Sequence, residues 1–414
     1  MAGLTFGVRK LVLFCLCLPA PQLGAQPSDT LTLDRAVAIA RTQSPLVLLA
    51  AGRRDLSTGR GRTEAAWPNP SAEWRRENLD SPLPPDIFAT LQVPLDVTGR
   101  RFALRQAGSA AAQRGRADSS ATLRQLELDV IRAFLRASLA DELSSIAASE
   151  QVARERTAVF DGQRFREGAV AEVVAMRTRL EADRARIALS AARGEAARAR
   201  AELARAIGIS TAAVGVLRTA THTPLLTIEG LDTTWSTVRA RRADLASVRY
   251  AAEESERRWR AERRGVIGDL NVVGGYKGTG GYATGLFGVM VPLPLFNRNE
   301  GPRQRAFGES AIARAELLDA ENRARGEIHA ATLAWEAARD AGREGAATLD
   351  ARAREVADIA ESSYREGATS LVELIESQRA RADARAAAAR WMVDIFLAEL
   401  ELRRATGAPL LRNP

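Results

Sequence analysis

The chain carries the same short series of residues twice, about half of its length apart. Phe165–Ala169 reads Phe-Arg-Glu-Gly-Ala, and Tyr364–Ala368 repeats it with one change at an offset of 199 residues. Two further short matches keep this offset to within one residue: Ala206–Gly208 with Ala405–Gly407, and Val93–Leu95 with Val291–Leu293. Three matches in one order and at nearly one spacing predict a duplicated chain, with repeat 1 over residues 26–215 and repeat 2 over residues 225–414.

Each repeat is predicted to contain a pair of β-strands. Ile87–Val93 shows two alternating sets of side chains, the period of a strand with two different faces. Lys277–Gly281 is rich in glycine and predicts the turn of a hairpin in repeat 2. The predicted strands fall in the regions 71–95 and 269–293: Ser71–Leu79 and Ile87–Leu95 in repeat 1, Asp269–Tyr276 and Tyr282–Val291 in repeat 2. Ser71–Leu79 has a poor composition for a strand, and its place in the repeat is the main argument for it.

Long helices are predicted around these strands. A first helix is expected from Thr32 to about Ala66, where the prolines of Trp67–Pro70 end it. After the strands, helical rods are expected from Arg100 to about Arg164 and from Gly301 to about Ser363. A rod of roughly 60 residues is about 90 Å long at 1.5 Å per residue, far more than a compact globule needs.

Glycines divide each rod from a return helix. Gly168 and Gly367 follow the rods, and the return helices are expected to end at Gly208 and Gly407, because glycine readily adopts the left-handed conformation found at helix ends. Each repeat is therefore predicted to form an antiparallel helical hairpin. The two hairpins span residues 99–208 and 298–407.

The composition favours extended helices with polar surfaces. Aromatic residues make up 5% of the chain and charged residues 27%. Val173, Leu180 and Ile187 are spaced seven apart, which predicts a coiled-coil stripe. Glu150 with Arg154 is expected to be one of the i,i+4 ion pairs on the outer surface. The net charge of +8 comes from arginines interleaved with acidic residues, so no nucleic-acid partner is expected.

The first 25 residues have the organisation of a secretory signal. Arg9 and Lys10 precede the apolar run Leu11–Leu18, and a small-residue cleavage site ends at Ala25. Both cysteines of the chain, Cys15 and Cys17, lie in this segment. The exported chain is therefore expected to have no disulfide, no thiolate metal site and no lipid anchor.

An exported chain without an apolar spanning helix crosses a bilayer as a closed β-barrel. Four strands are too few, because the smallest such barrels have about eight. Three protomers would together supply twelve strands. The expected fold is thus mainly α with a small β part: duplicated long helical hairpins forming an α-barrel, and four strands per protomer in a trimeric, 12-stranded transmembrane β-barrel.

Three segments resemble a known family, the TolC-like outer membrane factors, or outer-membrane efflux proteins. The tip and return helix Tyr364–Glu376 looks like the hallmark segment of that family, and Asn69-Pro70 also fits. Val291–Gly301 resembles its heavy-metal branch, the CzcC/CusC type. The resemblance covers essentially the whole chain after Ala25.

The resemblance implies a function and its partners. It implies the outer-membrane channel of a tripartite efflux pump, a homotrimer in contact with outer-membrane lipid, with a long periplasmic extension. The tips of the helical hairpins of such a channel dock onto a periplasmic adaptor protein and an inner-membrane transporter, which is of the RND type for this branch. The duct itself is passive, gated at the helical tips, and carries metal ions or drugs chosen by the transporter. An exit duct for type I secretion has the same fold and remains an alternative.

The resemblance also implies functional residues at the hairpin tips. Glu373 and Glu376 occupy the positions of an acidic ring around the periplasmic aperture, where carboxylates from three chains repel each other and favour cations. On spacing alone, both are ordinary exposed helix charges. The tip residues are candidates for adaptor docking: Gly168, Ala169, Gly367, Ala368 and Leu371.

Other classes of protein fit the sequence less well. An enzyme is not expected, because His222 and His329 have no partner at a ligand or catalytic spacing. No cofactor and no metal site are predicted. A periplasmic adaptor would carry one helical hairpin inserted into β-rich domains, and a coiled-coil scaffold would not need the strand pair of repeat 2.

Overall fold

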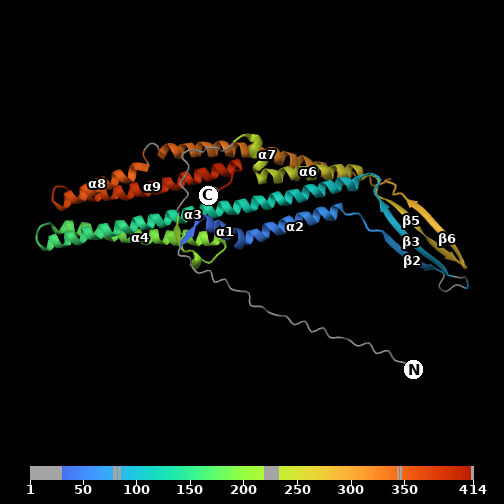
Figure 1. Ribbon diagram of the computed structural model, residues 1–414, viewed down its shortest axis with the longest axis horizontal. Coiled ribbons are helices and arrows are strands. Elements are labelled where there is room, and N and C mark those ends of the chain that lie inside the picture. The colour runs from blue at the N-terminus through green and yellow to red at the C-terminus, as the bar shows by residue number, and fades with distance from the viewer. Residues whose placement is uncertain are drawn as a thin grey trace, which may run out of the picture.

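The protein is an elongated bundle of helices with a small sheet at one end. The computed structural model describes residues 30–77, 82, 85–218, 233–342, 345 and 347–411. Long helices run side by side, and a four-stranded sheet continues beyond them (Figure 1). The predicted fold class, mainly α with a small β part, is confirmed. The predicted signal segment and His222 lie outside the described residues.

The sheet joins the strand pairs of both repeats. Its order is β2-β3-β5-β6, and every neighbouring pair is antiparallel. The strands are β2 (Ser71–Glu77), β3 (Asp86–Leu95), β5 (Leu270–Thr279) and β6 (Tyr282–Met290). The turn predicted over Lys277–Gly281 is shorter in the structure, because β5 continues to Thr279. Only Gly280 and Gly281 form it, with φ values of 58° and 87° that suit a tight two-residue hairpin.

The helical hairpin of repeat 1 is continuous. It consists of α3 (Arg100–Arg166) and α4 (Glu172–Ile207). The helix predicted from Thr32 to Ala66 is instead two helices, α1 (Leu33–Gln43) and α2 (Pro45–Ala65). The reason is Pro45, which lacks the N–H that would continue α1, while the Ser44 hydroxyl accepts a hydrogen bond from the Leu46 amide at the start of α2.

The helical hairpin of repeat 2 is interrupted. The rod predicted from Gly301 to Ser363 is divided into α7 (Glu300–Ala341) and α8 (Ala347–Arg365), and α9 (Leu371–Thr406) returns beside them. At the division, the Trp391 indole donates a hydrogen bond to the Ala338 carbonyl, 2.8 Å away. A Cβ at Gly342 would overlap the Trp391 ring. The indole of α9 thus occupies the space next to the end of α7.

Shorter elements pack around these hairpins. Helices α5 (Trp235–Arg241) and α6 (Ala243–Arg264) precede β5, and α6 packs against both α3 and α7. A small parallel pair joins β1 (Thr30–Thr32) to β4 (Val216–Arg218), with the 3-10 turn Thr211–Ala213 just before it. The main buried cluster is formed by α1, α3 and α4 around Phe134, whose side chain is fully buried.

The apolar stripe that packs α4 into its hairpin is not the one predicted. Val173, Leu180 and Ile187 are 68%, 51% and 72% exposed in the protomer. The side chains of α4 that are buried over most of this helix are small apart from one leucine, and two larger ones are buried near its end: Thr178, Ala182, Ala185, Leu189, Ala196, Leu203, Ala204 and Ile207. Small side chains let α3 and α4 approach closely, and Val173, Leu180 and Ile187 are left on the outside of the hairpin.

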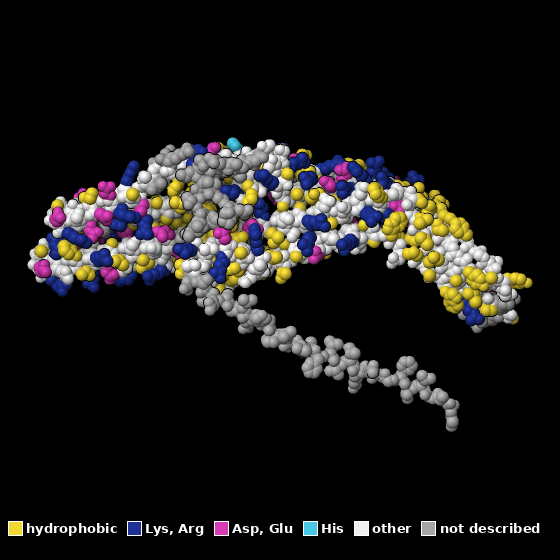
Figure 2. All heavy atoms as spheres, viewed as in Figure 1, with side chains coloured by type: hydrophobic (Ala, Val, Ile, Leu, Met, Phe, Trp, Pro, Cys, Tyr) yellow, Lys and Arg dark blue, Asp and Glu magenta, His cyan; other side chains and the backbone are white. Residues whose placement is uncertain are grey.

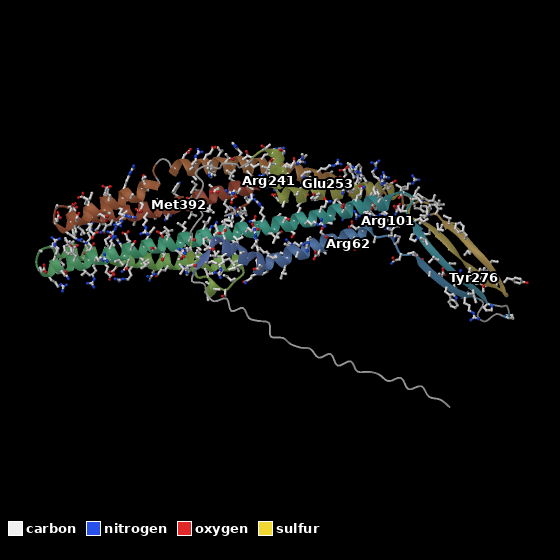
Figure 3. All side chains as sticks on the ribbon, in the orientation of Figure 1. Arg62, Arg101, Arg241, Glu253, Tyr276 and Met392 are labelled. Atoms are coloured by element: carbon white, nitrogen blue, oxygen red, sulfur yellow. The ribbon has the colours of Figure 1, made fainter. Side chains whose placement is uncertain are left out.

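The junction between helices and sheet is fixed by Arg101. Figure 3 places Arg101 where the helices meet the sheet, and Tyr276 within the sheet. The Arg101 guanidinium donates to the Asp269 carboxylate at 2.8 Å and to the Ala66 carbonyl at 3.0 Å. One side chain therefore holds the end of α2, the start of α3 and the start of β5 together. In the described part of the chain, every helix is too short or too polar to cross a lipid bilayer.

Helices α2 and α3 touch through glycines, which yields a first prediction. A Cβ at Gly108 would lie 2.5 Å from the Gly61 carbonyl oxygen, so Gly108→Ala must push the helices apart. We expect this change to lower the free energy of unfolding by about 1–3 kcal/mol. Gly59→Ala is the matched control, because nothing lies within 4 Å of its Cβ position. It should raise stability by about 0.5–1 kcal/mol. Thermal unfolding followed by circular dichroism measures both, and equal effects of the two changes would disprove the contact.

Candidate functional site at the hairpin tips

Both hairpin tips are closed by the same hydrogen-bond pattern. In repeat 1, Gly168 has a φ of 75°, and the Ala169 amide donates to the Arg164 carbonyl at 2.8 Å. In repeat 2, Gly367 has a φ of 78°, and the Ala368 amide makes the corresponding bond, also 2.8 Å long. This is the glycine-dependent arrangement that satisfies the last carbonyls of a helix. The first role of these four tip residues is therefore to form the turns between the helices.

The second tip is capped more firmly than the first. Leu371 is the first residue of α9, and the Ser370 hydroxyl accepts a hydrogen bond from the Glu373 amide at 3.2 Å. The Thr369 hydroxyl donates to the Glu373 carboxylate. The start of α4 has no such side-chain cap. Glu373 therefore helps to start α9, where its negative charge also suits the helix N-terminus.

Glu373 and Glu376 lie on one exposed face of α9. Both side chains are exposed, and their spacing of three residues makes them neighbours on the helix surface. Glu376 makes no ion pair with any of the described residues. The corresponding residues of repeat 1 are Val174 and Arg177. The paired carboxylates are therefore a property of the second hairpin alone.

The structure brings a further pair of residues together near the tips, Tyr364 of α8 and Asp161 of α3. The Tyr364 hydroxyl lies 2.9 and 3.0 Å from the two carboxylate oxygens of Asp161 and donates to them. Asp161 has no exposed surface and Tyr364 is 6% exposed. The Phe160 ring meets the Tyr364 ring edge-on, with centroids 6.5 Å apart. This contact ties the hairpin of repeat 2 to the hairpin of repeat 1.

Sequence reasoning missed this pair, although the repeat contains a hint of it. Tyr364 stands where repeat 1 has Phe165, and Asp161 stands where repeat 2 has Ala360. At both positions, one repeat is apolar and the other carries the polar group. These two differences between the repeats fall where the two hairpins contact each other.

Burial dominates the electrostatics of the pair. Loss of hydration raises the pKa of Asp161 above its usual value of 3.8, although the Tyr364 hydroxyl and the Arg164 guanidinium, 3.9 Å away, act in the opposite direction. Burial and the neighbouring carboxylate raise the pKa of Tyr364 to about 12. At neutral pH the tyrosine is therefore a protonated donor, and Asp161 depends on it for its hydrogen bonds.

Two arginines of α9 add further hydrogen bonds between the hairpins. Arg379 of α9 donates to Glu181 of α4 at 2.6 Å, and Arg385 of α9 donates to Glu142 of α3 at 2.9 Å. Burial acts to raise the pKa of Glu181, but its hydrogen bonds with arginines bring it below the usual value.

The position of Arg154 corrects the prediction that it forms a surface pair with Glu150. The pair exists, with a shortest N···O distance of 2.7 Å, but Arg154 is only 4% exposed. Its guanidinium also donates to the Ile375 carbonyl of α9 at 3.3 Å. Arg154 therefore belongs to the contact between the two hairpins.

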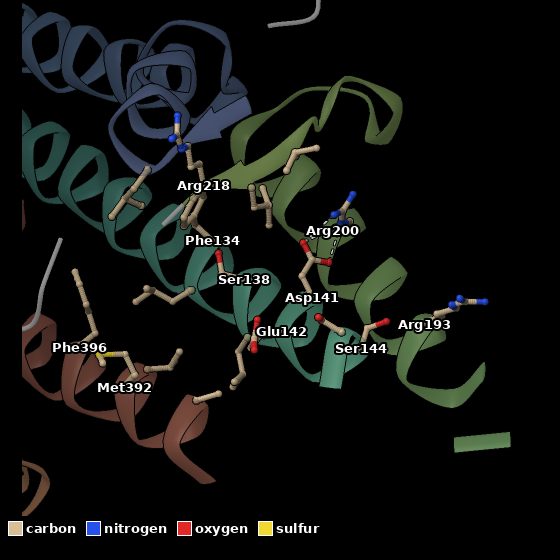
Figure 4. A pocket seen from close by; sticks show the side chains of 18 of the residues that line it. Phe134, Ser138, Asp141, Glu142, Ser144, Arg193, Arg200, Arg218, Met392 and Phe396 are labelled. Carbon is tan, nitrogen blue, oxygen red and sulfur yellow. Dashed lines mark hydrogen bonds and ion pairs between the residues drawn. The ribbon is translucent and has the colours of Figure 1, made fainter. Parts of the chain in front are cut away.

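A cavity of about 800 Å³ lies farther from the tips, between α3, α4 and α9 (Figure 4). Phe134, Met392 and Phe396 line one part of it, and Arg200 with Asp141 lines another. The two charged groups are bound to each other at 2.8 Å, and this hydrogen bond raises the pKa of Arg200. The residues lining the cavity include no histidine and no cysteine. Across the described residues, no group of three or more His, Cys, Asp or Glu side chains could hold a metal ion.

Comparison with known proteins gives a family match and a shared fold. Residues 234–408 match the family model described as outer membrane efflux protein, which confirms the resemblance to that family but does not distinguish its heavy-metal branch. That family consists of channels rather than enzymes. No curated protein matches the chain in sequence.

Solved structures cover nearly the whole chain at low sequence identity. A membrane protein from Pseudomonas aeruginosa is 19% identical, with a TM-score of 0.78 over 90% of this chain and 93% of that chain. The CmeC outer membrane channel of Campylobacter jejuni is 16% identical, with a TM-score of 0.77 over 91% and 85%. The outer membrane protein VceC of Vibrio cholerae is 18% identical, with a TM-score of 0.75 over 92% and 97%. The fold of the chain is the fold of these proteins.

Proposed function

We propose that this chain, whose C-terminal part matches the outer membrane efflux proteins, is one protomer of a trimeric exit duct. The duct passes passively from the periplasm through the outer membrane as part of a tripartite efflux pump. The observation that carries this proposal is the sheet, which has two open edges and two chemically different faces. Among the strands of the described residues, β2 and β6 each pair on one side only, which leaves unpaired backbone groups on the other.

The two faces of the sheet suit lipid on one side and water on the other. Residues that pair directly across antiparallel strands lie on the same face. One row of directly paired residues on this sheet consists of Trp74, Ala89 and Tyr276. A second row on the same face consists of Leu91, Gly274 and Phe287. The face that contains them is apolar except for Arg76. The opposite face carries most of the polar side chains of the sheet: Glu73, Arg75, Glu77, Asp86, Thr90, Gln92, Asn271, Lys277, Thr279 and Thr284.

Pairing of β6 with β2 of the next protomer removes both open edges. Three copies then form a closed barrel of twelve strands, with the apolar face towards lipid and the polar face towards the lumen. An open apolar sheet on a water-soluble protein would be an aggregation site. A periplasmic adaptor or scaffold does not need a sheet with an apolar face and open edges, so a membrane-spanning duct explains this sheet best.

The helical hairpins extend the duct into the periplasm. Their tips, with Gly168, Ala169, Gly367, Ala368 and Leu371, are the surface for docking of a periplasmic adaptor, and an RND-type inner-membrane transporter supplies the cargo. Val291–Gly301 resembles the metal-type branch and favours metal ions over drugs. Type I secretion uses the same kind of duct, and the transporter that co-purifies with the protein distinguishes the two pathways.

The tips act as the gate in this proposal. The Tyr364–Asp161 bond and the arginine links hold the two hairpins of a protomer together, which keeps the periplasmic end narrow. Three copies of Glu373 and Glu376 place six carboxylates around the aperture. Carboxylates at such a constriction attract multivalent cations, which block the passage.

Removing the carboxylates tests the aperture. Glu373→Gln with Glu376→Gln keeps the size of both side chains and an oxygen for the Thr369 hydroxyl. We expect block by multivalent cations in planar bilayers to weaken by about tenfold or more, since one charge pair 4 Å apart contributes about 1 kcal/mol even in water. Glu172→Gln, an exposed change at the start of α4, is the control and should leave the block unchanged. Unchanged block in the double variant would remove the aperture assignment.

Cell fractionation tests the function as a whole. The protein is expected in the outer-membrane fraction as a trimer that persists in detergent. An adaptor or a scaffold would fractionate with the periplasm or the inner membrane, and that result would overturn the proposal.

A further inference from the structure

The segment that leaves β6 presents apolar side chains to the surroundings. Leu293, Leu295 and Phe296 are 72%, 68% and 101% exposed in the protomer. Pro292 and Pro294 alternate with them and restrict the backbone, so the segment holds these side chains out with little freedom to fold back. Exposed apolar side chains of this size are unfavourable in water, and three of them in four residues indicate a surface that is covered in the working protein.

The same place in repeat 1 is built differently. There, Leu95 is followed by Asp96, whose carboxylate accepts hydrogen bonds from the Thr98 amide at 3.0 Å and the Arg101 amide at 2.6 Å. Those bonds form a compact polar turn into α3. Phe296 corresponds to Thr98 in the repeat. The exposed side chains of Leu293, Leu295 and Phe296 are therefore not needed to connect a strand to a helix, and they have a different role in repeat 2.

Arginines follow the apolar residues directly. Arg298 and Arg303 are exposed, and neither makes an ion pair with any described residue. Other arginines nearby already have partners within the protomer: the Arg263 guanidinium lies 5.2 Å from the centre of the Trp259 ring, and Arg264 donates to the Gly99 carbonyl at 3.0 Å. Figure 2 shows hydrophobic side chains gathered over the sheet end and basic ones on the adjoining helices. The charge at the junction is thus available for an anionic ligand.

We propose that this junction is a binding site for anionic phospholipid in the periplasmic leaflet of the outer membrane. Leu293, Leu295 and Phe296 insert among the acyl chains, and Arg298 and Arg303 bind the headgroup phosphates. Apolar side chains next to arginines in this order, from sheet to helix, match the order of acyl chain and headgroup at a membrane surface. The inference rests on the proposed function, which places the sheet in the bilayer.

Lipid retention tests the charged part of the site. The trimer is reconstituted with equal amounts of phosphatidylglycerol and phosphatidylcholine, and the lipids that stay bound are measured by native mass spectrometry. We expect phosphatidylglycerol to be retained preferentially. Arg298→Gln with Arg303→Gln should lower its affinity by about 25-fold, about fivefold per arginine. Arg323→Gln, an exposed change about 30 Å beyond Arg303 along α7, should have no effect. Equal retention of both lipids by the unaltered trimer would overturn the proposal.

Fluorescence tests the apolar part and separates this inference from the function it rests on. Quenching by brominated lipid is measured as the increase over the unaltered protein, because the native Trp74 already lies on the apolar face of the sheet. The Phe296→Trp variant should show such an increase, whereas Leu318→Trp on α7 should not. Phe287→Trp, in the middle of β6, should show it if the sheet lies in lipid at all. Quenching of the Phe287→Trp variant without quenching of the Phe296→Trp variant means that another protein or protomer covers the segment, and the lipid site is then wrong. Quenching of neither variant refutes the duct itself.

Discussion

Tyr364→Phe is expected to open the periplasmic end of the duct, with a large rise in the open probability of single channels in planar bilayers. The change removes only the hydroxyl that donates to both oxygens of the buried Asp161. A buried polar group left without its partner costs about 1–3 kcal/mol, and separation of the hairpins relieves this cost by hydrating the carboxylate. The equilibrium should therefore move towards the open state by about 5- to 150-fold per protomer.

Two further variants make this result specific. Tyr282→Phe, in the exposed β5–β6 hairpin, should behave as the unaltered channel. Asp161→Asn keeps an oxygen that accepts from Tyr364 but no longer carries a charge, so the tips should remain closed. An unchanged open probability for Tyr364→Phe would show that the pair does not hold the tips together.

For the proposed gate, the raised pKa of Asp161 predicts a pH dependence. With the hairpins in contact, burial raises the pKa of Asp161 above its usual value, and in open tips we expect the hydrated carboxylate to return towards a pKa of 3.8. The closed state therefore binds the proton more tightly, so protonation favours closure. The open probability should fall as the pH falls through the raised pKa and increase above it. Asp161→Asn should lose this response, and a response that persists in that variant would come from other groups.

Leu180→Asp combined with Ile187→Asp is expected to abolish the trimer. These side chains are 51% and 72% exposed in the protomer, on the opposite side of α4 from the small residues that pack its hairpin. In the proposed duct, each hairpin would lie beside a hairpin of the next protomer, and a stripe with a spacing of seven residues suits such a contact. Two aspartates per protomer would place six unpaired charges in the contacts of one trimer, at a cost of several kcal/mol.

The measurement is the mass of the detergent-solubilised protein, together with its helix content. The aspartate variant should run as a folded monomer with an unchanged circular dichroism spectrum. Ser190→Asp introduces a charge at another exposed position of α4 and should leave the trimer intact. A trimer that survives both aspartates would place the contact between protomers elsewhere.

Local signals in the sequence predicted the ends of many elements. The return helices end at Gly208 and Gly407, both with left-handed backbones, as expected for glycines after helices. The polar strand β2 could be placed only through the repeat, because its composition argues against it. The break at Pro45 was also visible in the sequence, since a serine followed by proline is a common helix start.

Local sequence patterns do not predict contacts between segments that are far apart in the chain. The division between α7 and α8 involves Trp391, which comes from α9 and stands about 50 residues away in the sequence. The buried face of α4 includes four alanines and a threonine, so the spacing of large apolar side chains along this helix does not identify it. Tyr364 and Asp161 are 203 residues apart, and only the differences between the repeats at these two positions hint at their contact.

Cysteine cross-linking across the open edges of the sheet shows directly whether the protomers share one barrel. Ala72→Cys in β2 is combined in turn with Ala283→Cys, Gly285→Cys and Phe287→Cys in β6, all on the apolar face, and Cys15 and Cys17 are replaced by alanine. In a shared barrel β6 of each protomer pairs with β2 of the next, so we expect at least one combination to yield disulfide-linked trimers on oxidation. Monomers alone from every combination, in protein that remains folded, would contradict a shared barrel and the transport role with it.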